Sequence, residues 1–306
     1  MKCLNIEKWR ILRGIHMFLS IRDFTVKWVG YDTVFEGLKD LGIPSFELFV
    51  SRELKVESYL DMGYVTELGF DVSSKESRED LKRRLREAEL RVCAILVEND
   101  FSSEDLGREV DYVLSAVKVA SELGVGVVRI NAVMRPIPGY DLEKHVRRVA
   151  DAVGRCMGSC RDLGVSLAVE NHGVIANKRE FLRSLFRMVD DEHLGLTLDT
   201  GNFYWFGYPL SEVYDIVKEF ASKVKHTHVK NATVKQDKRE TFRKPGDVEM
   251  APLYQGDINL EGIVKTLRRA GYDYDLTIED ESLGMFKDKE RLDVLKKDVE
   301  FIKRLT

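Results

Sequence analysis

The 306-residue sequence has no apolar run that approaches the length of a membrane span. A transmembrane helix needs about 18 or more consecutive, predominantly apolar residues. The opening segment, MKCLNIEKWRILRG, also has no apolar stretch long enough for a signal peptide. We therefore expect a soluble, cytoplasmic protein that has no membrane partner.

Cysteine is scarce, and its spacing excludes the common cysteine motifs. The chain has Cys3, Cys93, Cys156 and Cys160, and no two of them form a CxxC pair. Cys156 and Cys160 are four residues apart on a predicted helix, so their side chains share a face. This pattern favours ordinary buried thiols over a redox or metal-binding role, and it fits a reducing compartment.

The sequence also lacks long blocks of charge of one sign. Lys and Arg number 48, Asp and Glu number 52, and the formal net charge is −4. A general nucleic-acid binder is expected to carry a basic excess or a basic patch. We therefore expect a small-molecule substrate and no nucleic-acid partner.

Glycine-rich phosphate loops are absent, which argues against a doubly wound sheet that binds nucleotides: neither GxGxxG nor GxxxxGK[ST] occurs. Instead, eight short apolar runs alternate with amphipathic helical segments, several of which end in glycine. Eight strand–helix units are the count of an α/β (β/α)8 TIM barrel. We expect an N-terminal extension over residues 1–13 and one barrel domain over residues 14–306. The predicted strands cover 15–21, 45–50, 91–97, 126–133, 165–172, 194–200, 224–230 and 274–281.

The last four predicted strands end in polar side chains, although the runs themselves are apolar. Side chains two residues apart share a face of a strand. Glu170 ends the fifth strand, Asp199 ends the sixth, His226 and His228 share a face of the seventh, and Glu279 ends the eighth. In a barrel these strand ends converge on one mouth, where the active site of such folds lies.

Three carboxylates at one mouth would repel one another and raise the pKa of at least one of them. A divalent cation would remove this conflict. A single carboxylate at a strand end is more often a cap or an ion pair, but its repetition in successive strands favours one shared metal site. Three oxygen ligands and one neutral imidazole suit Mn²⁺, Mg²⁺, Co²⁺ or Zn²⁺, and the oxygen-rich set favours the harder ions.

These residues lie in motifs that resemble the sugar phosphate isomerase/epimerase family, the xylose isomerase-like TIM barrels of the AP endonuclease 2 superfamily. The resemblance covers about residues 14–300. Its motifs are LAVENHG, LTLDTGN, VKHTHVKN and GYDYDLTIEDES, the last preceded by YQGDINLEGIVKTL. The combination is specific, whereas each motif alone is not.

The resemblance implies one divalent metal ion held by Glu170, Asp199, His228 and Glu279. His228 is preferred over His226 because it directly precedes the tail Val229-Lys230-Asn231. The resemblance further implies that Glu170 and Glu279 are the catalytic acid–base pair. Residues assigned to substrate contacts are His172, Asn202, Lys230 and Arg129.

Two further residues have weaker assignments. Glu47 matches a recurrent acidic position near the end of the second strand and is expected behind the ligands. His16, in the first strand, is expected in the barrel core, with a substrate contact as the alternative.

The sequence departs from parts of the family pattern. Asn202 stands where many relatives carry histidine, and Val234 stands where ketose 3-epimerases of the family carry arginine. No histidine follows His228, which disfavours the zinc AP endonucleases. Free-ketose epimerisation is therefore less firmly implied than the metal site itself.

The implied activity is that of a metal-dependent sugar or sugar-phosphate isomerase or epimerase. Glu170 and Glu279 approach the substrate from opposite sides, so that one removes a proton beside the carbonyl and the other returns it. An inosose-type dehydratase, with Lys230 as helper, is the alternative; an AP endonuclease-like or non-catalytic barrel is less favoured. The substrate, the metal and the oligomeric state, including a homo-oligomer, stay open.

The longest predicted connection, residues 231–258, is expected to lie at the active mouth. A long loop there is a natural lid. Its basic residues would bind a phosphate or carboxylate of the substrate, and a solvated mobile loop is the alternative. They are Lys235, Lys238, Arg239, Arg243 and Lys244.

Overall fold

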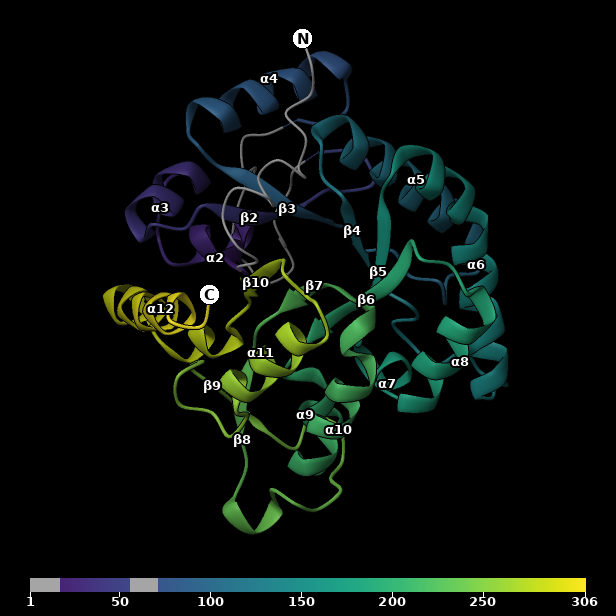
Figure 1. Cartoon of the computed structure of the whole chain (residues 1–306), viewed down its shortest axis with the longest axis vertical. Helices are drawn as coiled ribbons and strands as arrows, with labels where there is room; N and C mark the ends of the chain where they lie inside the picture. Colours follow the sequence, from purple (N-terminus) through teal and green to yellow (C-terminus); the bar gives the residue numbers. More distant parts are fainter. Residues whose placement is uncertain (1–16, 56–70) are drawn as a thin grey trace.

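The computed structural model describes residues 17–55 and 71–306. Eight parallel strands form one sheet in the order β10-β1-β2-β3-β4-β5-β6-β7. A further parallel bridge between Val229 and Ile278 joins the two edges, so the sheet closes into a barrel (Figure 1). The strands are β1 Phe18–Arg22, β2 Ser45–Phe49, β3 Arg91–Leu96, β4 Val127–Ile130, β5 Ser166–Glu170, β6 Leu194–Asp199, β7 Val224–His228 and β10 Asp275–Ile278.

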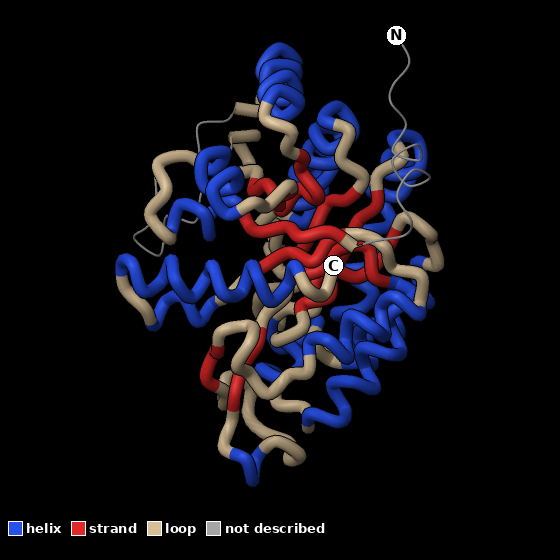
Figure 2. The backbone as a smooth tube through the Cα atoms, turned by 60° about the vertical axis from the view of Figure 1, so that its left-hand side comes forward, coloured by secondary structure: helices blue, strands red, loops and turns tan. Residues whose placement is uncertain are grey.

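Long helices surround this barrel, as the tube view in Figure 2 shows. They are α3 Val34–Leu41, α4 Lys75–Glu87, α5 Leu106–Leu123, α6 Leu142–Leu163, α8 Arg179–Val189, α10 Leu210–Phe220, α11 Leu260–Arg269 and α12 Asp288–Lys303. Each lies within a segment predicted as helical. The single-domain (β/α)8 fold is therefore confirmed. The predicted extension, residues 1–13, and His16 lie outside the described residues.

Capping residues fix where the helices begin and end. Ser74 accepts a hydrogen bond from the backbone of Ser77 and forms a capping box at the start of α4. Gly124, with φ of 78°, ends α5 in the left-handed conformation that favours glycine. Apolar side chains then cover the sheet, as in α8, where Phe181, Leu182 and Leu185 are buried.

Short elements at the carboxyl ends of strands are the part of the fold that the periodicity did not predict. Helix α2 Asp23–Trp28 follows β1 directly, α7 Gly173–Ala176 follows β5, and α9 Asn202–Phe206 follows β6. The 3₁₀ helix η4 Glu281–Met285 follows β10, and a further 3₁₀ helix, η2 Ala221–Lys223, lies at the other end of a strand, before β7. Elements of three to six residues are too short to show a helical period.

The connection 231–258 has structure of its own. Strands β8 Asn231–Thr233 and β9 Glu249–Ala251 pair antiparallel, with η3 Gln236–Lys238 between them. Asn231 binds the backbone at both ends of the following turn: its Nδ2 lies 2.9 Å from the carbonyl oxygen of Leu253 and its Oδ1 lies 3.0 Å from the nitrogen of Ile258.

Two of the predicted phosphate-binding residues in this connection are engaged within the protein. The Arg243 guanidinium lies 4.2 Å from the centre of the Tyr204 ring and donates to the Tyr204 carbonyl at 2.9 Å. Arg239 pairs with Asp257. Gly207, with φ of 112°, allows the close approach of Arg243, since a Cβ there would lie 2.1 Å from the Arg243 carbonyl oxygen. Arg243 thus ties the connection to α9, and substrate binding by this segment would fall to its lysines.

The described cysteines are ordinary buried thiols, as predicted. Cys93, Cys156 and Cys160 are free and buried. Burial raises the pKa of the Cys156 and Cys160 thiols to about 12, which keeps them protonated and unreactive. Across residues 17–55 and 71–306, no helix combines the length and apolar content that crossing a membrane requires.

A buried pair of acids joins α12 to the end of β10. Asp298 accepts a hydrogen bond from the backbone nitrogen of Leu253 at 2.7 Å, and Asp280 accepts one from that of Ser282 at 2.8 Å. Burial, together with the Asp280 charge, raises the pKa of Asp298 well above that of an ordinary aspartate. Asp298 therefore keeps its proton in the folded state at neutral pH.

We predict that Asp298→Asn removes part of the pH dependence of stability. Unfolded Asp298 loses its proton near pH ~4, whereas the folded state keeps it, so the wild-type free energy of unfolding falls as pH rises above that value. Asparagine keeps an acceptor for the Leu253 nitrogen and places an uncharged donor beside Asp280. Denaturant unfolding between about pH 5 and about pH 9 should show the wild type losing stability relative to the variant. Asp293→Asn, at an exposed position on the same helix, is the control and should leave the pH dependence of stability unchanged. If the stability of Asp298→Asn varied with pH in parallel with the wild type, the protonated state assigned to Asp298 would be contradicted.

Candidate metal centre

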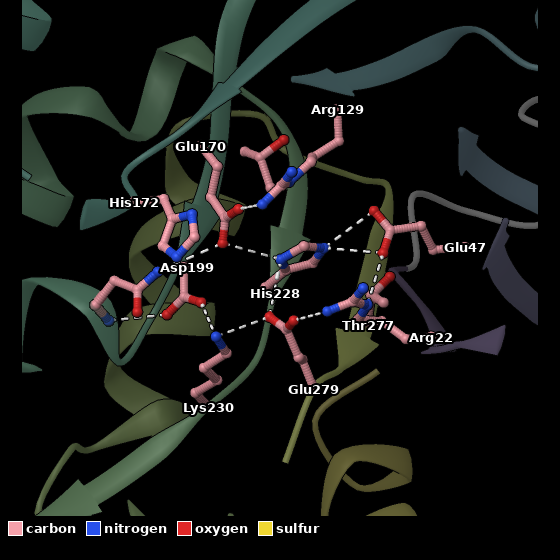
Figure 3. Close-up of polar contacts among 12 residues, drawn as sticks. Arg22, Glu47, Arg129, Glu170, His172, Asp199, His228, Lys230, Thr277 and Glu279 are labelled. Carbon is pink, nitrogen blue, oxygen red and sulfur yellow. Dashed lines mark hydrogen bonds and ion pairs between the residues drawn. The ribbon is translucent and has the colours of Figure 1, made fainter. Parts of the chain in front are cut away.

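Four residues predicted as ligands come together at the carboxyl ends of their strands. Glu170, Asp199 and His228 are the last residues of β5, β6 and β7, and Glu279 directly follows β10. All four are buried, and one ligand atom from each lies within 4.8 Å of those of the others. Figure 3 shows them facing a common centre. The barrel closure therefore brings together side chains that are up to 109 positions apart in the sequence (170 to 279).

Asp199 is oriented by the turn that it begins. Its Oδ1 accepts hydrogen bonds from the backbone nitrogens of Gly201 and Asn202, each at 2.8 Å. These bonds start helix α9, and they leave Oδ2 directed at the other acids. The turn Asp-Thr-Gly-Asn thus both ends the strand and orients the Asp199 carboxylate.

His228 lies at the middle of the cluster. Its Nδ1 is 2.9 Å from Glu279 Oε2 and 3.2 Å from Glu170 Oε1, and its Nε2 is 3.0 Å from Glu47 Oε1. Burial alone would lower its pKa, but the facing Glu279 and Glu47 carboxylates raise the pKa to about 9. The imidazole therefore offsets negative charge at neutral pH.

Each of the two glutamates is held by its own buried arginine. Arg129 Nη2 bonds to Glu170 Oε2, and Arg22 Nη1 bonds to Glu279 Oε1. The second oxygen of each glutamate is left facing His228. Burial acts to raise the pKa of Glu279, but His228, Lys230 and Arg22 hold it well below its usual value. This glutamate is an anion at neutral pH.

Lys230 supplies a third buried cation. Its Nζ lies 3.0 Å from Asp199 Oδ2, 3.0 Å from Glu279 Oε2 and 2.7 Å from Glu281 Oε1. Burial opposes its charge, but the three carboxylates raise its pKa well above the usual value. Lys230 is therefore a fixed ammonium at the edge of the cluster.

The donor set fits a divalent cation. Asp199 Oδ2 and Glu279 Oε2 are buried and have no hydrogen bond of acceptable geometry to the described residues, although Lys230 Nζ is 3.0 Å from each. They face the same space as Glu170 Oε1 and His228 Nδ1. Three carboxylate oxygens and one imidazole nitrogen form a set that Mn²⁺, Mg²⁺, Co²⁺ and Zn²⁺ accept.

The residues predicted to contact substrate lie at the same mouth, but two of them are engaged with Glu170. Asn202 Nδ2 lies 3.4 Å from Glu170 Oε1, and Arg129 also lies 3.4 Å from Glu98. His172 Nδ1 is 3.2 Å from Asn131 Oδ1. Burial, and then the nearby Arg129 and Lys230 charges, lower the pKa of His172 to about 4, so its imidazole is neutral.

Three residues at this mouth were not predicted. Arg22 ends β1, while Glu98 and Asn131 follow β3 and β4. Asn131 Nδ2 donates to Glu98 Oε2 at 3.2 Å. The signal that could have found them is the one used for the last four strands, namely a polar residue where a buried strand ends.

His226 and Glu47 lie behind the ligands. His226 Nε2 is 2.9 Å from Glu47 Oε1, and its Nδ1 is 2.9 Å from Asp275 Oδ1. Burial acts to lower the pKa of His226, but Asp275 and Glu47 raise it. Both ring nitrogens are thus occupied by carboxylates.

By its fold and its site, this protein is a (β/α)8 barrel with a candidate metal centre, formed by buried acids and an imidazole at the carboxyl ends of the strands. More particularly, the chain belongs to the family of xylose isomerase-like TIM barrels, whose model matches residues 35–305. The resemblance seen in the sequence is confirmed.

Relatives carry different activities. An inosose dehydratase of Clostridium perfringens is 25% identical over 154 residues, which are 45% of this chain and only 48% of that protein. A solved structure of the IOLI protein with a zinc atom has a TM-score of 0.68 at 16% identity and covers 94% of this chain and 96% of its own. An L-ribulose 3-epimerase has a TM-score of 0.64 at 17% identity, with 94% of both chains covered. At these identities the structures show a shared fold.

We predict that Asp199→Asn abolishes tight metal binding without unfolding the protein. The asparagine oxygen can still accept from Gly201 and Asn202, while its amide nitrogen replaces the carboxylate oxygen that faces the cluster. Affinity for Mn²⁺ or Zn²⁺ in a chelator competition should fall by more than the roughly hundred-fold seen when a residue behind a ligand is lost. The melting temperature without metal should stay near that of the wild type. Unchanged affinity would remove Asp199 from the site.

Proposed function

We propose that this protein is a divalent-metal-dependent isomerase or epimerase of a sugar or sugar phosphate, which transfers a proton next to a carbonyl. The observation that carries this proposal is the matched pair Glu170 and Glu279. Glu170 ends β5 and Glu279 directly follows β10. Each is bonded to a buried arginine through one oxygen, and each presents the other oxygen to a common centre. The L-ribulose 3-epimerase and zinc-bound neighbours support the proposal.

Glu170, Asp199, His228 and Glu279 would hold the metal ion, which when bound acts as a Lewis acid toward the substrate carbonyl. One glutamate takes the proton from the neighbouring carbon, and the other returns a proton from the opposite side. Arg129 and Arg22 each bind one oxygen of their glutamate and thereby fix which oxygen is left to transfer the proton. Two bases in similar surroundings suit a reaction that runs in both directions.

Lys230 and His172 complete the chemistry at the mouth. The Lys230 ammonium donates a hydrogen bond to the oxygen on which negative charge develops. The neutral His172 imidazole, half-buried at the mouth, exchanges hydrogen bonds with substrate hydroxyls. Both act without a change of charge at neutral pH.

A dehydratase acting on an inosose-type substrate is the second candidate, and Lys230 favours it. Its Nζ lies 3.0 Å from Glu279 Oε2, so an acid and a base stand side by side. A glutamate takes the proton from carbon, a carbon–carbon double bond forms as the bond to the leaving hydroxyl breaks, and Lys230 protonates that hydroxyl, which leaves as water. The inosose dehydratase relative supports this alternative.

We predict solvent exchange at carbon without loss of water. Metal-loaded protein in deuterated water, given keto-sugars with and without phosphate and inososes, should place deuterium next to the carbonyl of its substrate. Glu170→Gln and Glu279→Gln should each slow exchange by roughly 10²- to 10⁴-fold, the usual range for a positioned acid or base. Glu109→Gln is the matched control, because Glu109 is a buried glutamate that pairs with the half-buried Arg52 outside the site.

The outcomes separate the two candidates. Deuterated epimer or isomer supports the first, whereas an unsaturated or dicarbonyl product with release of water supports the second. In the second case, Lys230→Gln should reduce water release more than it reduces deuterium exchange. Metal-loaded protein that exchanges no proton in any of these substrates would contradict both.

A further inference from the structure

Glu47, on β2, contacts the imidazole of His228 from the side opposite the candidate ligands. Its carboxylate is buried, with Oε1 at 3.0 Å and Oε2 at 3.1 Å from His228 Nε2. The other ring nitrogen of His228, Nδ1, faces Glu170 Oε1 and Glu279 Oε2. Figure 3 shows the imidazole of His228 between Glu47 on one side and Glu170 and Glu279 on the other.

This contact decides which nitrogen of His228 is able to bind a metal. A neutral imidazole carries one proton, and only the nitrogen without it binds a cation. An ionised carboxylate accepts hydrogen bonds and donates none, so Glu47 requires the proton to be on Nε2. That leaves the lone pair on Nδ1, the nitrogen that faces the other ligands.

Glu47 is itself held in one orientation. Its Oε1 lies 2.9 Å from His226 Nε2, and its Oε2 lies 3.4 Å from Arg22 Nε. His226 is fixed in turn through Nδ1 by Asp275, whose Oδ2 accepts from the hydroxyl of Thr277 at 2.6 Å. A chain of contacts from β10 through β7 to β2 therefore leaves Glu47 little freedom to turn.

We propose that Glu47 is a positioning residue that keeps a proton on Nε2 of His228, so that a divalent metal takes the place of the proton on Nδ1, and that the affinity of the site for the metal depends on it. This inference rests on the metal site put forward above. Residues behind a ligand that accept its remaining N–H typically contribute ten- to hundred-fold to metal affinity.

A second group of residues, Glu47, His226 and His228, also lies close enough together to surround a cation. Hydrogen bonds already engage both Glu47 oxygens and both His226 nitrogens. Asp199 Oδ2 and Glu279 Oε2, on the other side of His228, lack hydrogen bonds of acceptable geometry within the described residues. The cation therefore belongs on the Nδ1 side, and Glu47 is not a ligand.

The test is the binding of Mn²⁺ and Zn²⁺ to the full chain by calorimetry and chelator competition, for the wild type, Glu47→Gln and Glu109→Gln. Glutamine keeps one acceptor but places an amide NH₂ against His228 or Arg22. We expect one ion per chain in each protein, wild-type affinity for Glu109→Gln, and a roughly ten- to hundred-fold loss for Glu47→Gln.

Other results overturn the inference in distinguishable ways. Equal affinity of the wild type and Glu47→Gln overturns the role of Glu47 and leaves the metal site standing. A fall from two ions to one would make Glu47 a ligand instead. Failure of the wild type to bind either ion would overturn the metal site and the proposed function together.

A second measurement on the wild type applies even where Glu47→Gln does not fold. Nitrogen NMR of the zinc-loaded, ¹⁵N-histidine-labelled chain reports the state of each ring nitrogen. We expect His228 to show zinc on Nδ1 and a slowly exchanging proton on Nε2. Zinc on Nε2, or a His228 proton that exchanges rapidly with solvent, would overturn the proposal.

Discussion

Charge balance among buried side chains is the constraint on which the mouth of this barrel depends. Three buried carboxylates meet there, and each has its own cation: Glu170 has Arg129, Glu279 has Arg22 and Asp199 has Lys230. A buried carboxylate without such a partner would be neutralised or expelled. The pairing offsets part of the negative charge while leaving one oxygen of each carboxylate turned toward the common centre, which a divalent cation is suited to occupy.

The same constraint explains why the chemistry proposed for the site requires little movement. The glutamates are set by arginines on neighbouring strands, Asp199 by the turn that starts α9, and His228 by Glu47 behind it. Groups fixed before the substrate arrives need no reorganisation when charge develops on it. The connection over residues 231–258 is likewise tied to α9 through Arg243, so part of the wall near the mouth is also fixed.

Most of the fold could be predicted from the sequence, because strand and helix periods are strong over these lengths. Acids at the ends of apolar strands indicated a shared metal site, and the family resemblance supplied the choice of Glu170, Asp199, His228 and Glu279 as its ligands. The arginine partners of the two glutamates could not be predicted. The sequence assigned Arg129 to a substrate contact and gave Arg22 no role. Only the closed barrel brings Arg129 to Glu170 and Arg22 to Glu279, which is 257 positions away. The short helix α9 was missed because its start depends on one aspartate turn rather than on a period.

Anomalous diffraction from crystals of the full chain grown with Mn²⁺ or Zn²⁺ tests directly whether the four candidate ligands hold a cation. We expect one anomalous peak per chain, bonded to Glu170, Asp199, Glu279 and Nδ1 of His228, with the proton-bearing Nε2 still on Glu47. A peak elsewhere, or clear density for these side chains with no ion between them at saturating metal, would contradict it.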